Sequence, residues 1–123
     1  MGERIEELYA ISFRGPFPYN DCFWLASHLK KPSSELIPEL DWYFATVAGY
    51  ASSASRLAER APEELQAAEK LLSKDFFDYF PDLEVYRPLI EAEHTPRLNE
   101  RMKIVEEMRL GLLLLLREMP KPE

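Results

Sequence analysis

Residues on which several classes of site depend are scarce in this chain of 123 residues. A single cysteine, Cys22, excludes a disulfide within the chain and favours a reducing compartment. Only four glycines are present, and no Gly-rich phosphate-binding loop occurs. The sequence also lacks Cys-x-x-Cys, His-Glu-x-x-His and Gly-x-Ser-x-Gly motifs. We therefore expect no nucleotide, no metal and no other cofactor.

Long apolar runs are missing as well. The longest, Leu112–Leu116, is far shorter than the roughly 18–20 residues that cross a bilayer. The chain starts with MGERIEELYA, which is acidic where a secretory signal is basic. A formal net charge of −7 disfavours contact with nucleic acid or an anionic membrane, since both are polyanions. The sequence thus predicts a soluble cytoplasmic protein that has neither of these as a direct partner.

Charge is absent from one stretch, Trp42–Ser55, although 30% of the residues in the chain are charged. A helix without charge on any face is typical of a buried helix. We therefore predict a helix over Glu35–Arg60 that is enclosed on every side and forms the centre of the fold. Apolar residues recur along it at steps of three and four, the period of a helix, at Leu36, Leu40, Tyr43, Val47, Ala51 and Ala54.

Ten prolines divide the rest of the chain. Together with capping residues such as Asn20 and Thr95, they predict further helices. Pro88 should kink or split one of them, because proline lacks an N–H and clashes with the preceding turn. We predict an all-α fold with one domain over residues 1–123, a single bundle of five to six mostly antiparallel helices. The helices beside the central one are expected over residues 3–13, 21–31, 62–80, 83–94 and 96–119.

The excess negative charge is concentrated between Pro62 and His94. This segment holds nine acidic and three basic residues, whereas the remainder of the chain is nearly neutral. One interpretation is a solvated acidic face that keeps the protein soluble. The other is a docking face for a basic protein partner, with Asp75, Asp78, Asp82 and Glu84 as its contact residues.

Aromatic residues are dense between Phe13 and Trp24, which hold five aromatic side chains and two prolines in twelve residues. They either fix this loop to the bundle or form an apolar surface for a protein partner or a small planar ligand. The residues predicted to contact a partner are Phe17, Tyr19, Phe77 and Tyr79.

The last helix becomes apolar on every face toward its end. A seam through Leu112 accounts for part of this stretch, and four further leucines remain. Either several helices bury them, or they form a contact between two copies of the chain, since exposed apolar patches mark partner surfaces. The residues predicted for this dimer contact are Leu110, Leu113, Leu114 and Leu116.

Six residues separate Arg87 from His94. Arginine and histidine at this spacing in a small all-helical chain resemble the HEPN-type ribonucleases. The resemblance covers eight residues and the fold class, and Pro88 stands where that family has a polar residue. It implies that Arg87 would hold a phosphate and that His94 would exchange protons with the ribose 2′-hydroxyl. The other interpretation pairs Arg87 with a nearby acid and places His94 at a helix C-terminus.

Metal and thiol chemistry find little support in the spacing of the remaining candidates. Glu91 and His94 share a helical face, but the second Glu-x-x-His that a metal pair needs is missing. Cys22 and His28 do not share a helical face, so we expect Cys22 to be a small buried residue. The hypotheses about function therefore depend on the distribution of charge and on the residues predicted to lie at the surface.

The leading hypothesis is a non-catalytic protein-protein interaction protein. By size, charge and class it is analogous to inhibitors and immunity-type antagonists of basic, nucleic-acid-handling enzymes, whose phosphate sites carboxylates can occupy. The alternatives are a HEPN-like ribonuclease that uses Arg87 and His94, and a homodimeric adaptor or assembly chaperone.

Overall fold

All regular structure in the computed structural model is helical within the residues that it describes, which are 2–13, 16–90 and 95–119. This confirms the predicted all-α bundle, although the helices are more numerous than expected. The elements are α1 (Gly2–Ser12), α2 (Tyr19–Leu29), α3 (Ser33–Ala51), the 3₁₀-helix η1 (Ala54–Glu59), α4 (Pro62–Leu72), α5 (Phe76–Tyr79), α6 (Pro81–Glu84), α7 (Arg87–Ile90) and α8 (Pro96–Glu118).

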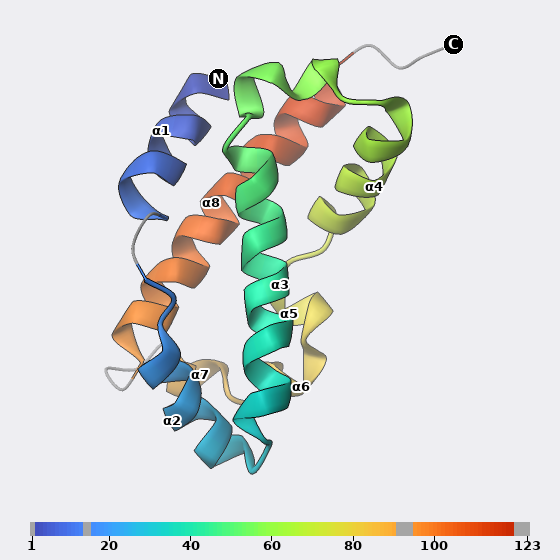
Figure 1. Cartoon of the computed structure of the whole chain (residues 1–123). Helices are drawn as coiled ribbons and strands as arrows, with labels where there is room; N and C mark the ends of the chain where they lie inside the picture. The colour runs from blue at the N-terminus through green and yellow to red at the C-terminus, as the bar shows by residue number, and fades with distance from the viewer. Residues whose placement is uncertain (1, 14–15, 91–94, 120–123) are drawn as a thin grey trace.

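The two long helices, α3 and α8, lie side by side and run in the same direction (Figure 1). The helices α1, α2 and α4 run in the opposite direction, so the bundle is mostly antiparallel (Figure 1). α1 packs against α8 and η1, α2 against α3, and α4 against α8. The short helices α5, α6 and α7 cover the lower end of the α3–α8 pair (Figure 1).

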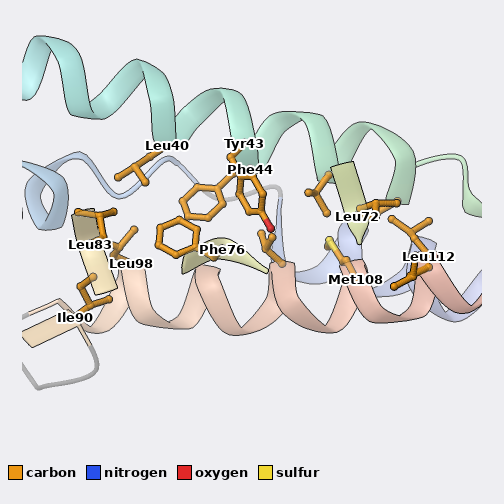
Figure 2. Packing of buried hydrophobic residues seen from close by; sticks show 14 of the residues in the cluster. Leu40, Tyr43, Phe44, Leu72, Phe76, Leu83, Ile90, Leu98, Met108 and Leu112 are labelled. Atoms are coloured by element: carbon orange, nitrogen blue, oxygen red, sulfur yellow. The ribbon is translucent and has the colours of Figure 1, made fainter. Parts of the chain in front are cut away.

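The hydrophobic core lies between α3 and α8. Figure 2 shows Tyr43 and Phe44 of α3 directed toward α8, with Phe76 of α5 beside them. Each fully buried side chain of this size stabilises the fold by about 1.5–3 kcal/mol relative to an exposed one. Buried residues of α8 and of the shorter elements complete this core, among them Leu25, Leu72, Leu83, Ile90, Leu98, Met108 and Leu112.

The predicted central helix is too long at its C-terminal end. α3 ends at Ala51, and the chain turns at Ser52 and Ser53 before η1 begins. The Ser52 hydroxyl donates to the Gly49 carbonyl at 2.9 Å, which competes with continuation of the helix. Arg60 then donates to the Ser53 hydroxyl oxygen at 2.9 Å and holds η1 against this turn.

The prediction that this helix is enclosed on every side is also wrong. Val47 is completely buried, but Trp42 is 54% exposed, and Ala45 and Gly49 face solvent. Small uncharged residues lose little free energy when they are exposed, so they do not require burial. α3 is therefore one-sided, with its core face set by the helical period.

The N-terminus of α8 is capped by a side chain from a distant helix. Asp21 of α2 accepts hydrogen bonds from the amides of Arg97 and Leu98, each at 2.9 Å. Thr95, the predicted cap, is buried and donates its hydroxyl to the Ile90 carbonyl at 2.6 Å. The amides at a helix start need acceptors, and here the fold rather than the local sequence supplies them.

Two more helix ends are joined to distant residues in the same way. Glu6 of α1 accepts from the amide of Ser55 at 3.0 Å and from its hydroxyl, and these hydrogen bonds lower the pKa of Glu6. Arg109 of α8 is buried and donates to the Leu72 carbonyl at 2.7 Å, at the end of α4. Glu106 accepts from Nε of Arg109 at 2.9 Å, and this bond raises the pKa of Arg109.

Other boundaries differ from prediction for local reasons. α2 begins at Tyr19 and has no side-chain capping bond, so Asn20 lies inside it rather than capping it. The helix predicted over residues 62–80 stops at Leu72, because Asp75 caps a new helix. The segment predicted over residues 83–94 is divided between α6 and α7, with Pro88 in the first turn of α7, and its residues 91–94 lie outside the described ones.

Candidate functional site

The turn from α4 into α5 uses two of the acidic residues predicted to contact a partner. Oδ1 of Asp75 accepts from the Asp78 amide at 2.9 Å, and Oδ2 of Asp78 accepts from the Asp75 amide at 3.3 Å. This reciprocal capping box supplies acceptors to amides at the start of α5. Both carboxylates therefore have a structural role, whatever else they contact.

The other two predicted acids differ from each other in their surroundings. Glu84 accepts from the Arg87 guanidinium at 3.0 Å, and that guanidinium also lies over the Phe77 ring at 4.1 Å. Asp82 is exposed at the start of α6, and its carboxylate makes neither hydrogen bond nor ion pair within the described part of the chain. Of the four acids, Asp82 is thus the one that remains available to a partner.

Asp82 lines a groove of about 470 Å³ between the α2–α3 connection and the α5–α6 turn. Local sequence signals determine the α5–α6 side of the groove, because the capping box starts α5 and Pro81 at the first position starts α6. We call it the α3–α6 groove, and its lining residues are Leu29, Lys31, Leu36, Glu39, Tyr79, Phe80, Pro81, Asp82, Leu83 and Tyr86.

The α3–α6 groove combines an apolar floor with acidic groups. Leu36 and Leu83 are 1% and 3% exposed, whereas Asp82 and Glu39 are exposed. Lys31 lies 3.2 Å from Glu39 and neutralises it in part. Such a site suits a ligand group that has an apolar stem and a cationic end, as lysine and arginine side chains have.

Aromatic side chains border the same groove. Tyr79 and Tyr86 line it, and the exposed Trp42 meets Tyr79 edge-on at 6.4 Å between ring centroids. Burial raises the pKa of Tyr79. Its phenolic hydroxyl can both donate and accept a hydrogen bond. Trp42, Glu39 and Tyr86 were not identified from the sequence as residues of a site. Trp42 and Glu39 are three residues apart, a spacing that places both on one helical face beside the buried stripe.

Most of the aromatic residues predicted to contact a partner help to build the core instead. Phe17 is half-buried, and its ring lies 6.2 Å from that of Phe44. Phe77 packs on Phe76, with 5.1 Å between the ring centroids. Tyr79 packs on Tyr43 at 5.4 Å and also reaches the groove.

Tyr19 is the predicted aromatic contact with the largest exposed fraction, 52%. Phe23, one turn further along α2, is 50% exposed, and the sequence interpretation did not single it out. The two lie one turn apart on α2, whose buried residues are Cys22, Leu25 and Ala26.

The arginine–histidine pair is described only in part. Arg87 lines a pocket of about 240 Å³ together with Phe77, Asn99 and Lys103. Its Nε is buried and has no acceptor among the described residues. His94 lies outside the described residues, so the predicted joint role of Arg87 and His94 remains a prediction.

Metal and thiol chemistry can be judged only for the described residues. Within residues 2–13, 16–90 and 95–119, no three His, Cys, Asp or Glu side chains lie where they could hold a metal ion. Cys22 is fully buried, and burial raises its pKa to about 12, so the thiol stays protonated and unreactive. His28 shares a hydrogen bond of 2.9 Å with the Trp24 carbonyl and stacks on the Trp24 ring.

The leucines at the end of α8 fall on different faces. Leu113 is 7% exposed and belongs to the core, so it is not available to a second chain. Leu116 is half-buried and packs against the core. Leu110 and Leu114 are 52% and 49% exposed, and they lie one turn apart on the outer face of α8.

These features define a small acidic all-helical protein with an acidic groove bordered by aromatic residues. The chain belongs to the YxiJ-like protein family, whose model matches residues 3–114. That match extends from α1 through most of α8. No curated protein and no solved structure gives a match to the chain. Among the described helices, none is both long enough and apolar enough to span a membrane.

Proposed function

We propose that this protein is a non-catalytic interaction protein, which binds a basic protein partner through the α3–α6 groove. The observation that carries the proposal is the Asp82 carboxylate, which has no ion pair in the described structure and borders an apolar floor. A lysine or arginine of the partner would lay its stem over Leu36 and Leu83 and direct its charge to Asp82 and Glu39.

The aromatic border adds to this mode of binding. The faces of Tyr79 and Tyr86 can contact a cationic group, and Trp42 extends the aromatic surface along α3. Tyrosine and tryptophan are enriched among the residues that dominate binding free energy. The groove would therefore make the specific contacts with the partner. The remaining acidic residues would attract the basic partner over longer distances.

We propose further that the partner is a nucleic-acid-handling enzyme and that the protein acts as its antagonist. A site that binds phosphates presents basic side chains. Carboxylates can bind to these side chains in place of the phosphates. The net charge of −7 favours rapid encounter with such a surface. Inhibition of the partner by the intact chain is the expected consequence.

The test begins with affinity purification from the native host to identify the partner, followed by binding kinetics with purified proteins. Asp82→Lys should lower the affinity by about tenfold or more, because it replaces attraction with repulsion inside the contact. The association rate of the wild type should fall steeply as salt is added.

The matched control is Glu69→Lys, the same charge change at an exposed position on α4, which does not line the groove. It should slow association only modestly. Equal effects of the two variants would remove the groove from the proposal. Binding that ignores salt and depends on Tyr19 and Phe23 would instead favour the adaptor or chaperone hypothesis.

A ribonuclease of the HEPN-like type is the second proposal, and the buried Nε of Arg87 without an acceptor favours it. Such a group beside a pocket could hold a phosphate oxygen. Purified wild-type protein should then cleave RNA, and Arg87→Ala or His94→Ala should abolish cleavage while the far-UV circular dichroism is retained. Absence of RNA cleavage by the wild type would contradict it.

A further inference from the structure

The outer face of α8 carries a stripe of exposed residues that repeats like one seam of a coiled coil. Lys103, Glu107, Leu110, Leu114 and Arg117 are all exposed and follow one another at steps of four and three. Two leucines at the centre are thus flanked by an acidic residue on one side and a basic residue on the other. No other described helix presents two leucines to solvent in this way.

A second copy of this chain is the partner that fits the stripe. If two α8 helices met in parallel, each residue would face its own copy, and Glu107 would oppose Glu107. An antiparallel pair with its two-fold axis between Leu110 and Leu114 places each of these leucines against the other in the second copy. The same arrangement places Glu107 against Arg117 of the second copy, so both charges are matched.

Both charged residues are available for these contacts. Arg117 makes no ion pair or hydrogen bond in the described part of the structure. Glu107 lies 3.9 Å from Arg4, but both side chains are largely exposed, and such a pair contributes little. The neighbouring antiparallel registers, one heptad away, would set charged residues against the leucines.

We propose that the protein forms an isologous homodimer through the outer faces of two antiparallel α8 helices. The apolar contact is small, so the dimer forms weakly and depends on protein concentration. The lining of the α3–α6 groove contains no residue of α8, so each subunit keeps its groove open. The dimer is therefore bivalent and would gain avidity toward a partner that presents two sites.

Sedimentation equilibrium of the wild type, in a concentration series up to about 1 mM, should show mass rising from 14.4 kDa toward twice that value. Glu107→Arg or Arg117→Glu alone should raise the dimer Kd by about tenfold or more, since each ion pair occurs twice. Combining the two substitutions should restore the wild-type Kd. The matched control is Glu100→Arg, an exposed α8 position whose counterpart in this register lies beyond the end of α8 at Glu118.

A cross-linking experiment tests the direction of the helices. Under oxidation, a mixture of Leu110→Cys and Leu114→Cys variants should form disulfide-linked dimers faster than either variant alone. Cys22 is buried with a raised pKa and does not interfere. A wild type that stays monomeric throughout the series, a double charge reversal that fails to rescue, or a mixture that links no faster than the single variants would each overturn the proposal.

Discussion

In both long helices, the pattern of burial differs from what the amino-acid composition of the helix suggests. α3 carries no charge from Trp42 to its end, yet Trp42 is 54% exposed and Ala45 faces solvent. α8 is rich in charged residues, yet it buries Arg109 against α4 and directs Leu110 and Leu114 outward.

The comparison shows that burial follows the helical period and the completeness of hydrogen bonding rather than the average polarity of a helix. Alanine, glycine and serine can face water at little cost, so a face made of them need not be covered. A charged side chain can enter the core when its donors have acceptors, as those of Arg109 have at Leu72 and Glu106.

Substitutions at two neighbouring positions of α3, one on its buried face and one on its exposed face, should differ most in their effect on the free energy of unfolding. Phe44 is 1% exposed and stacks on Phe76, so Phe44→Ala should lower the free energy of unfolding by about 3–5 kcal/mol. Ala45→Glu, on the exposed face, should change it by less than about 0.5 kcal/mol. Urea denaturation followed by circular dichroism measures both. A comparable loss for Ala45→Glu would show that the outer face of α3 is covered after all.

The buried charge of α8 supplies the next largest effect. Arg109→Met keeps the length of the side chain but removes the donors to Leu72 and Glu106, and should cost about 2–4 kcal/mol of stability. Arg117→Met, on the exposed face, is the control and should be nearly neutral in dilute solution. A neutral Arg109→Met would mean that this arginine is present for a reason other than closing the end of α4.

The distant cap of α8 is expected to have an intermediate effect. Asp21→Ala removes the acceptor of two α8 amides and should lower the free energy of unfolding by about 1–2 kcal/mol. Asn20→Ala changes the neighbouring residue, which makes no capping bond, and should stay within about 0.5 kcal/mol of the wild type. Thermal and urea unfolding of the pair compare them directly. Equal losses of stability in the two variants would mean that Asn20 caps α2, as the sequence predicted.

The sequence predicts the helical class, the proline-marked breaks and the buried stripe Leu36, Leu40, Tyr43 and Val47, because these depend on local period and chain stiffness. The capping box of Asp75 and Asp78 could also have been recognised, since the two residues have the required spacing.

Other features depend on tertiary packing that no local pattern encodes. Asp21 reaches an amide 76 residues away, and Glu6 reaches Ser55. The α3–α6 groove forms because residues of α2, α3 and α6 that are distant in the sequence line it together. Three of the four acids predicted to contact a partner are engaged within the chain. Of the residues predicted to contact a partner, Asp82 and Tyr79 line the groove, and the sequence could not distinguish them from the others.

The two glycines inside α3 and α8 allow a further comparison of these helices, with the smallest expected effect on the free energy of unfolding. A Cβ added at Gly49 would meet nothing within 4 Å, whereas one at Gly111 would lie 3.0 Å from Cδ1 of Ile5. Gly49→Ala should therefore raise the free energy of unfolding by about 0.5–1 kcal/mol, because alanine favours the helix and restricts the unfolded chain. Gly111→Ala gains the same propensity but must displace a buried side chain, and should be less stable than Gly49→Ala by about 1 kcal/mol.

Ile5→Val decides whether this contact is the cause, because valine lacks the Cδ1 atom that the new methyl group would meet. Gly111→Ala should then be less unfavourable in the Ile5→Val background than in the wild type, so the double-mutant cycle should show a favourable coupling. A cycle without coupling would mean that α1 shifts as a unit to make room. In that case the close approach of α1 and α8 is set by the helices themselves rather than by the side chain of Ile5.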